Sequence, residues 1–496
     1  MMPMLSCDTM VALPEATASG QTLFAKNSDR PPDECQPLVL RPRQVHPAGA
    51  ITHCQFVELP AAPVTYRHIG SRPYWCWGYE HGFNEHQVVI GNEALHSRAP
   101  KAAEPRLIGM EIIRLGLERG RTAAEAVEVM TEAISRYGQG VFANDAGVRT
   151  YDNGYIVADP REAYVVEAVG RQWAVKQARG TVGISNVFSL GADWDRLAPT
   201  AESEAVARGW WQPGAARFDW AAAYAAANRE LDEAQVARAA ALLDTAPGAL
   251  GLPFADWTAD RLREYLVGHE GIAVSEEAAT AINTELRSAT RRARSCALLR
   301  QRSGAVDARA MMAILRDHSS GRTPEEPLQA EIGGGWPSIC MHTRGGDSGN
   351  TAASLVADLA ADGSRLPVYW CSFYSPCLGI FLPIFVEGEL PAALSAGGAA
   401  SKTSGAAPKT SGAWWQFHRL SRLARAGGAE RIRHVRERWV ALEDEFLGSA
   451  YDMARRGREL QDAGRPDEAS RLLSDYMQRN ADLALELVAR MLRGTS

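Results

Sequence analysis

The sequence lacks the features that would place the chain in a membrane or on a nucleic acid. Its longest apolar run, near Ile380 to Val386, is broken by Pro383 and is far shorter than the ~20 residues that a membrane helix needs. Acidic residues (59) outnumber basic ones (53), and the formal net charge is -6. Neither nucleic acid nor an anionic membrane is therefore expected as a partner. We interpret the arginine cluster at 291–294 as a solvated helix face.

A secretory signal, a disulfide framework and a metal-binding spacing are also missing. The first twenty residues have no basic segment followed by a long apolar stretch, which favours a cytoplasmic protein. No CxxC pair occurs, and the cysteine pattern is typical of a reduced compartment. The eleven histidines show no zinc-like spacing, so we expect no metal and no cofactor. The eight cysteines are at positions 7, 35, 54, 76, 296, 340, 371 and 377.

The composition is that of an ordinary globular protein, with 46% hydrophobic and 23% charged residues over 496 positions. From Cys7 to Ala94, short apolar runs alternate with Gly and Pro, which predicts an antiparallel sheet. Helical periodicity follows, and Thr122 with Glu125 forms a capping box. A second group of strands predicts a second sheet. Its strands are expected at Gly154–Ala158, Ala163–Val169, Trp173–Lys176 and Thr181–Ser185.

The remaining chain alternates between helical and strand patterns. Residues 199–330 are Ala-rich and helical, and we interpret them as an insertion in a sheet protein. Strands return at Pro337–Met341, Ala352–Ala357, Leu366–Phe373 and Gly379–Phe385. Residues 391–412 are rich in Ala, Gly and Ser, which predicts a flexible linker or loop. Residues 413–496 predict a C-terminal helical extension, with a turn at Gly464–Asp467 between two long helices that pack back on the sheets.

Cys7 is the first candidate for chemistry, because it opens an apolar strand only six residues from Met1. If the leader Met1–Ser6 were removed, Cys7 would carry both a thiol and a free α-amine. A thiol titrates near ~8.5 and an α-amine near ~7.7–8.0, so one residue could supply both nucleophile and base. Loss of the leader could be autocatalytic or assisted by an aminopeptidase.

Four polar residues at the ends of other strands could complete a site with Cys7. A cation such as Lys26 favours the thiolate, and a carboxylate such as Asp29 can orient the amine. Asn92 and Asn186 each follow a buried strand, and Asn side-chain amides can stabilise an oxyanion. Each asparagine could equally close its strand as an Asx turn. His86 and His342 are expected to be structural or to face the substrate.

Several motifs in register resemble those of secernins, and the resemblance covers most of the chain in order. The motifs are Phe24-Ala25-Lys26-Asn27-Ser28-Asp29-Arg30-Pro31, Ser71-Arg72-Pro73-Tyr74-Trp75-Cys76-Trp77-Gly78, Asn84-Glu85-His86, Gly91-Asn92-Glu93-Ala94, Arg136-Tyr137-Gly138-Gln139-Gly140, Ile184-Ser185-Asn186, Ile314-Leu315-Arg316-Asp317, Ser338-Ile339-Cys340-Met341 and Thr351-Ala352-Ala353-Ser354. Secernins belong with the C69 dipeptidases, within the N-terminal nucleophile hydrolases.

The resemblance implies an α+β fold of four layers, αββα, with a helical insertion and C-terminal helices. It also implies that Cys7 is the nucleophile and that Lys26 stands where related acylases often have arginine. Asp29 would contact the α-amine, while Asn92 and Asn186 would contact the oxyanion and the substrate amide. In many animal secernins the candidate cysteine aligns with Thr9, which faces the same side of the strand as Cys7. Thr9 is therefore the alternative nucleophile.

The sequence thus predicts a leader at 1–6, a hydrolase domain at 7–390 that includes the insertion at 199–330, the linker at 391–412 and the extension at 413–496. The predicted activity is dipeptidase-like hydrolysis of a C–N bond through a thioester, with Cys7, Lys26, Asp29, Asn92 and Asn186 as catalytic residues. The alternatives are an amide acyltransferase and a non-hydrolytic trafficking or binding protein. The expected partner is a small peptide or amide substrate, and a homo-oligomer is compatible with the sequence.

Overall fold

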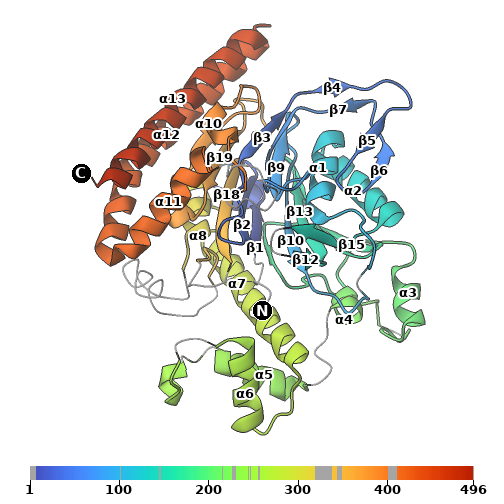
Figure 1. The fold of residues 1–496 in the computed structure, drawn as a ribbon. Coiled ribbons are helices and arrows are strands. Elements are labelled where there is room, and N and C mark those ends of the chain that lie inside the picture. The colour runs from blue at the N-terminus through green and yellow to red at the C-terminus, as the bar shows by residue number, and fades with distance from the viewer. Residues whose placement is uncertain are drawn as a thin grey trace.

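The structure is a computed structural model in which two sheets pack face to face between layers of helices (Figure 1). It describes residues 7–100, 102–144, 147–214, 216–225, 231–243, 245, 247–254, 257–318, 338–342, 349–399 and 410–494. The predicted leader at 1–6 and residues 400–409 of the predicted linker lie outside the described residues. The four-layer αββα sandwich predicted from the sequence is confirmed.

The six-stranded sheet carries the start of the described chain near its middle. All its neighbouring strands are antiparallel, and β1 lies between β16 and β2. In spatial order the strands are β16 (Thr181–Ser185), β1 (Cys7–Ala12), β2 (Leu23–Arg30), β18 (Asn350–Asp358), β19 (Val368–Phe373) and β20 (Leu382–Ile384). Strands from distant parts of the sequence therefore meet around β1.

The eight-stranded sheet faces it and is also antiparallel throughout. Its strands are β17 (Arg196–Leu197), β15 (Gln172–Gln177), β14 (Ala163–Val169), β13 (Asp152–Ala158), β10 (Val89–Leu95), β9 (His81–Asn84), β8 (His68–Ser71) and β3 (Leu38–Arg41). The peripheral strand pairs are β4 (Gln44–Val45) with β7 (Val64–Thr65), β5 (Ile51–His53) with β6 (Glu58–Pro60), and β11 (Phe142–Asn144) with β12 (Gly147–Arg149).

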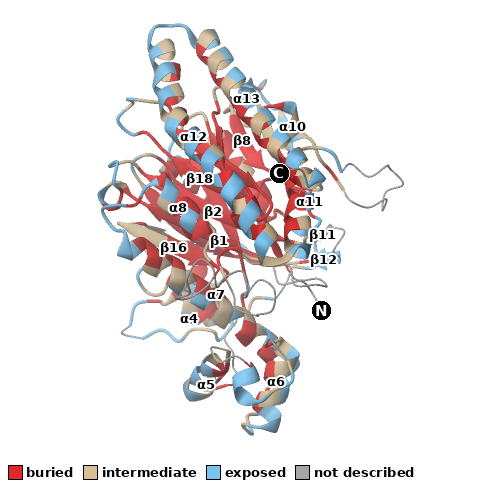
Figure 2. Cartoon of the chain, turned by 90° about the vertical axis from the view of Figure 1, so that its left-hand side faces the viewer, coloured by how far each residue is buried: buried red, intermediate tan, exposed pale blue. Residues whose placement is uncertain are grey.

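Strand alternation decides which side chains of β1 and β2 lie between the two sheets. Cys7 pairs with Ser28 and Thr9 pairs with Lys26, so these four residues share one face. That face meets the eight-stranded sheet, because Lys26 donates to the backbone oxygen of Asn92 in β10. The opposite face of β1 and β2 meets the outer helices. Every residue of both strands is buried, as Figure 2 shows for this sheet.

Two helices cover the outer face of the eight-stranded sheet. Helix α1 (Gly109–Arg119) packs on β9 and β10, and α2 (Ala123–Tyr137) packs on β14 and β15. The predicted start of α2 is confirmed, because the Thr122 side chain accepts a hydrogen bond from the Glu125 N–H at 3.1 Å. This contact satisfies one of the amide groups that have no partner within the first turn of a helix.

The other outer layer is built from helices that the sequence analysis assigned to an insertion and to the C-terminal extension. Helix α7 (Glu276–Gln301) packs on β16 and β1, and α8 (Ala308–Leu315) packs on β2 and β18. Helices α7 and α8 are therefore part of the sandwich rather than an insertion in it. The layer is completed by α11 (Ala413–Ala426), α12 (Gly428–Asp462) and α13 (Pro466–Arg493), the last two forming the predicted antiparallel hairpin.

Only the middle part of the Ala-rich region forms a separate cluster, whereas its first part, which includes Ala201 and Trp220, belongs to the main core. Residues of α5 (Glu233–Leu243), α6 (Ala259–Gly268) and the beginning of α7 share a small apolar cluster of their own, which includes Leu242, Leu262 and Ile282. Figure 1 shows this cluster apart from the sheets. The remaining short elements are α3 (Ala201–Ala207), α4 (Trp220–Tyr224), α10 (Ala392–Ser395), η1 (Pro14–Ala16), η2 (Pro247–Leu250) and η3 (Pro376–Leu378).

One strand predicted from the sequence is wrong. Residues 338–341 of the predicted strand Pro337–Met341 have no strand pairing; they run beside the end of β2 as an irregular segment. The predicted linker begins with a helical turn, α10. Among the described residues, no helix combines the length and apolar character needed to cross a bilayer.

The irregular segment is held by a buried asparagine of β2. The Asn27 side-chain amide donates to the backbone oxygens of Leu315 and Ile339, each at 2.8 Å, and its oxygen accepts from Ser354 at 2.7 Å. Close by, a bulge shifts the pairing of β18 with β2 between Thr351 and Ala353. Asn27 therefore joins the sheet to the chain on either side of residues 319–337 of the sequence.

We predict that N27A lowers the free energy of unfolding by about 2–5 kcal/mol, because two buried carbonyl oxygens lose their donor. Urea unfolding followed by circular dichroism measures the change. The matched variant S354A removes one hydrogen bond from the same group and should cost about 0.5–1.5 kcal/mol. Equal stability of N27A and the unmodified protein would contradict the anchoring role of Asn27.

Candidate active site

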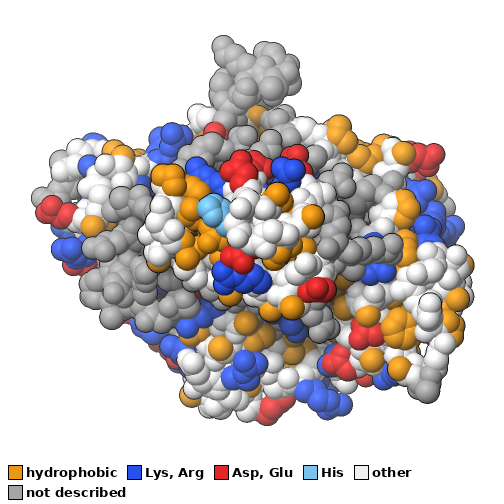
Figure 3. Space-filling model, turned by 90° about the horizontal axis from the view of Figure 1, so that it is seen from below, with side chains coloured by type: hydrophobic (Ala, Val, Ile, Leu, Met, Phe, Trp, Pro, Cys, Tyr) orange, Lys and Arg blue, Asp and Glu red, His pale blue; other side chains and the backbone are white. Residues whose placement is uncertain are grey.

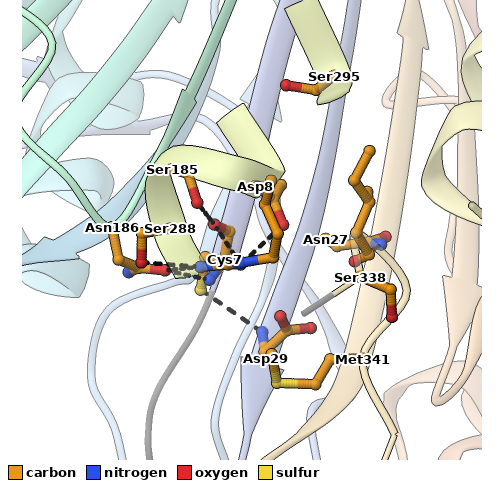
Figure 4. Close-up of polar contacts among 12 residues, drawn as sticks. Cys7, Asp8, Asn27, Asp29, Ser185, Asn186, Ser288, Ser295, Ser338 and Met341 are labelled. Carbon is orange, nitrogen blue, oxygen red and sulfur yellow. Dashed lines mark hydrogen bonds and ion pairs between the residues drawn. The ribbon is translucent and has the colours of Figure 1, made fainter. Parts of the chain in front are cut away.

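Cys7 is the first residue of β1 and is almost completely buried (5% exposed). Its backbone nitrogen donates to the Asn186 side-chain oxygen at 2.7 Å, and its carbonyl oxygen accepts from the Ser185 hydroxyl at 3.2 Å. The Sγ atom accepts from the Asp29 N–H at 3.5 Å. Figure 4 shows Cys7 between Asn186 and Asp29. Two of the four predicted partners of Cys7 thus contact it directly.

Asn186 follows β16 and is fixed on both sides of its amide. The nitrogen donates to the backbone oxygen of Ala94 at 2.9 Å, which ties it to the end of β10. The oxygen accepts from Arg291 at 3.0 Å as well as from Cys7. In this arrangement Asn186 orients the nitrogen of Cys7, while the predicted contact with an oxyanion stays a prediction.

Arg291 corrects the interpretation of the arginine cluster as a solvated helix face. The α7 helix turns this side chain inward, where it is 2% exposed and pairs with Asp8 at 2.8 Å. It also donates to the carbonyl oxygen of Cys7 at 3.3 Å and to Ser288 at 3.2 Å. Its neighbour Arg294 is partly exposed and pairs with Asp317. Arg292 also contacts the sheet, since its Nε donates to the backbone oxygen of Gly183 in β16 at 3.2 Å, so helical periodicity turns more than one arginine of the cluster toward the sheet.

Asp29 differs from the other buried carboxylates of the site because it has no ion pair among the described residues. One carboxylate oxygen accepts from the Thr351 hydroxyl at 2.6 Å, and the other is buried without a hydrogen-bond partner. Thr351 also bonds Met341 through both backbone and side chain. The predicted contact of the Asp29 carboxylate with the α-amine stays a prediction.

Lys26 lies between the sheets with Glu93 and Thr9. Its ammonium group donates to the backbone oxygen of Asn92 and lies 3.8 Å from Glu93 Oε1. The Thr9 hydroxyl donates to the same Glu93 oxygen. A Cβ atom on Gly91 would come within 2.5 Å of the Lys26 side chain, so glycine allows the two sheets to approach here. Lys26 is thus a buried cation beneath Cys7.

Burial raises the pKa values of the acids around Cys7. Burial raises the pKa of Asp8 to about 6 and that of Asp29 to about 7, although the Arg291 guanidinium opposes both shifts. Burial likewise raises the pKa of Glu93 to about 8, with Lys26 opposing. The pKa of the Cys7 thiol is raised well above its ordinary value, mainly by burial, and Lys26 opposes this too. The thiol is therefore neutral while the chain continues before Cys7.

No side-chain base contacts the Cys7 thiol among the described residues. Its hydrogen bond comes from a backbone amide, and the Cys7 nitrogen itself is an amide as long as Ser6 precedes it. His81 is buried, and its pKa is lowered well below the ordinary value, first by burial and then by Lys26. Among the described residues, the structure therefore offers this thiol no side-chain base.

The prediction that Asn92 follows a strand is wrong, because Asn92 lies within β10. Hydrogen bonds connect Asn92 to a residue that lines a cavity. Its side-chain nitrogen donates to Asn153 at 3.0 Å, and the Asn153 nitrogen donates to Gln139 at 2.7 Å. The Asn92 side-chain oxygen is buried and has no partner among the described residues. Gln139 lines a cavity of about 230 Å³ whose wall also includes Tyr151 and Arg106.

The five predicted site residues lie around one point, but the structure adds four that the sequence analysis did not select. Asp8 and Glu93 directly follow Cys7 and Asn92 in sequence, and Glu93 also stands in the motif that begins at Gly91. Thr351 opens another of the motifs, but the motif assigned it no role. Arg291 comes from a distant helix, and nothing in its local sequence distinguished it from a surface position.

Comparison with known proteins gives structural likenesses at low identity, and no family model matches the chain. A conjugated bile acid hydrolase from Clostridium perfringens is similar over 74% of this chain and 89% of its own, at 15% identity and a TM-score of 0.35. A penicillin V acylase from Agrobacterium tumefaciens is similar over 76% and 86%, at 15% identity and a TM-score of 0.32. Likenesses at this level concern chain arrangement and carry no information on activity.

We predict that D29N removes part of the pH dependence of stability. Folding raises the pKa of Asp29 from 3.8 to about 7, so its stabilising contribution is present below pH ~4 and is lost as the pH rises through ~7. Relative to the unmodified protein, D29N should gain about 2–4 kcal/mol between these pH values. Urea unfolding at several pH values measures this difference.

The control is D475N, which changes an exposed aspartate on α13 and should leave the slope unaltered. If D29N and D475N show the same dependence on pH, Asp29 is not the buried acid that the geometry indicates.

Proposed function

We propose that the protein is a cysteine-nucleophile amide hydrolase of the secernin and C69 dipeptidase type, acting on small peptides or amides. The observation that carries this proposal is the pair of contacts at Cys7. Asn186 holds its nitrogen at 2.7 Å, and no side-chain base reaches its thiol among the described residues. The arrangement suits a residue whose own nitrogen becomes the base once the preceding peptide bond is cut.

The mechanism begins with loss of Met1–Ser6, which converts the Cys7 amide nitrogen into an α-amine. The amine takes the thiol proton, and the thiolate attacks the substrate carbonyl carbon to form a tetrahedral oxyanion. The protonated amine then gives its proton to the leaving nitrogen, and the C–N bond breaks. Water, deprotonated by the same amine, attacks the thioester and releases the acid. Lys26 stabilises negative charge beside the sulfur throughout.

The charge balance of the site supports a free amine at this position. Asp8 pairs with Arg291, and Glu93 lies near Lys26, but Asp29 has no cation partner among the described residues. An α-ammonium would add the missing positive charge and further N–H donors. Four buried side-chain oxygens near the site have no hydrogen-bond donor among the described residues, namely Asp8 Oδ1, Asp29 Oδ2, Asn92 Oδ1 and Glu93 Oε2.

The position in the strand favours Cys7 over Thr9 as the nucleophile. Cys7 begins β1, and its nitrogen bonds a side chain rather than a neighbouring strand. Thr9 lies inside the strand, paired with Ile184 on one side and Lys26 on the other. Freeing the Thr9 nitrogen would require removal of residues that hold the sheet together, and its hydroxyl already donates to Glu93.

We predict that C7A lowers kcat/KM for dipeptide hydrolysis at least about 10⁴-fold, because the attacking atom is lost. C7S should retain the leader or process it slowly, since a hydroxyl is a weaker nucleophile than a thiolate. Intact-mass spectrometry shows whether the chain starts at Cys7, and a cysteine-directed activity probe identifies the labelled residue. C54S, which changes a partly exposed cysteine outside the site, is the control.

Three results would overturn this proposal. Full activity with Met1–Ser6 still attached would exclude the free-amine mechanism. Unchanged function of C7A would favour a binding or trafficking protein. Product formation only when an added amine accepts the acyl group would favour an acyltransferase.

We infer that the cavity beside Gln139 receives the carboxylate of the substrate. Arg106 lines it and contacts an acid only loosely, with 3.9 Å to Glu104, whereas Arg208 is paired with Glu204 at 3.0 Å. An incompletely paired guanidinium suits the carboxylate of a short peptide. Figure 3 shows acidic and basic side chains interspersed on the face seen from below. This face therefore has no extended positive electrostatic potential, and an anionic substrate would be selected by a single local cation.

We predict that R106A lowers kcat/KM about 10- to 100-fold for a dipeptide with a free carboxylate, through loss of a charged hydrogen bond. The same dipeptide as a C-terminal amide should be hydrolysed equally by both proteins. R161A, an exposed arginine outside the cavity, is the matched control. Equal losses on the two substrates would place the carboxylate elsewhere.

A further inference from the structure

Two histidines and two cysteines meet in a part of the structure that the proposed reaction does not use. The His/Cys cluster consists of His318, Cys340, His342 and Cys377, and one ligand atom from each lies within 4.8 Å of all the others. The Nε2 atoms of the histidines are 2.8 Å apart. Both sulfur atoms lie near His342 Nε2, that of Cys340 at 3.4 Å and that of Cys377 at 3.3 Å.

The residue types and distances match a tetrahedral zinc site. Zinc binds cysteine sulfur at about 2.3 Å and histidine nitrogen at about 2.0–2.1 Å, so ligand atoms at tetrahedral corners lie about 3.3–3.8 Å apart. The two distances from His342 Nε2 to sulfur are in or at this range, the two nitrogens need to separate by about 0.5 Å, and the remaining pairs lie within 4.8 Å. Four such ligands, three of them buried, make a closed site of the structural kind.

The backbone around the cluster is held independently of any metal. Cys340 donates its N–H to the backbone oxygen of Asp317 at 3.0 Å, which joins two of the segments that carry the ligands. The Arg436 side chain donates to the backbone oxygen of Cys377 at 3.1 Å. Arg316 donates to the backbone oxygen of Pro376 at 2.9 Å. Such contacts orient metal ligands and limit the ordering cost of binding.

We propose that the His/Cys cluster binds one zinc ion with a structural role. The ion would join the end of α8, the segment 338–342 and η3, which are distant in sequence. Met341 lies within this segment and bonds Thr351, whose hydroxyl holds Asp29. Figure 4 shows Met341 beside Asp29. The zinc would therefore fix one wall of the candidate active site without contacting the substrate.

The test uses the full chain purified without chelator and measures bound metal by inductively coupled plasma mass spectrometry. We expect about one zinc per chain, and less than about 0.1 in the double variant C340S/C377S. The matched control is C54S/C296S, which removes two cysteines outside the cluster and should keep the zinc. Circular dichroism and thermal unfolding show whether each variant is folded.

A second measurement does not depend on the variants. The chain is stripped of metal with a chelator and titrated with Co²⁺, which should give thiolate-to-cobalt charge-transfer absorption and tetrahedral d–d bands at about one equivalent. Added Zn²⁺ should abolish both signals and raise the unfolding temperature. Absence of these bands in folded protein, zinc retained by C340S/C377S, or a Cys340–Cys377 disulfide in the purified chain would each overturn the proposal.

This test is independent of the hydrolase assignment. Zinc content, cobalt spectra and unfolding temperature are read without a substrate, so an inactive protein can still bind zinc. Conversely, hydrolysis blocked by C7A with unchanged zinc content would support both proposals separately.

Discussion

The buried guanidinium of Arg291 joins the outer helices to the start of β1. It neutralises Asp8, bonds the carbonyl oxygen of Cys7 and shares the Asn186 oxygen with the Cys7 nitrogen. A buried ion pair contributes little net stability, but removing one partner leaves an uncompensated charge at a cost of several kcal/mol. The position of Cys7 thus depends on helix α7, which follows it by more than 260 residues in sequence. Of the two outer helical layers, the one that contains α7 contacts the candidate site directly, through Arg291.

The fold could be predicted from local patterns where those patterns were strong. Short apolar runs predicted β14 and β16 at their observed bounds, and the Thr122 cap predicted the start of α2. The assignment of β16 to a second sheet was wrong, because β16 pairs with β1 in the six-stranded sheet. The apolar residues of 338–341 predicted a strand, but this segment forms no strand pairing among the described residues. The role of α7 as a layer was missed for a different reason. An amphipathic helix shows which face is apolar but not which sheet that face will cover.

The sequence predicted those residues of the candidate site that lie at or next to the end of a strand. Cys7, Asp29 and Asn186 converge because β1, β2 and β16 are neighbours, and their polar ends therefore lie at one edge. Arg291 was hidden within a charged cluster, since net charge and spacing do not reveal which arginine faces inward. The His/Cys cluster was hidden by distance along the chain. His318 and Cys377 lie 24 and 35 positions from His342, beyond any local metal motif.

The bulge between Thr351 and Ala353 divides β18 into two independent halves. From Ala353 onward the strand pairs with residues 28 to 23 of β2, whereas Asn350 and Thr351 pair with Arg30 and Asp29. Because one extra residue is inserted at the bulge, the side chains before and after it do not follow one continuous alternation between the two faces of the sheet. A change of register at Asn350 and Thr351 therefore need not shift the pairs that Ala353 to Asp358 form with β2.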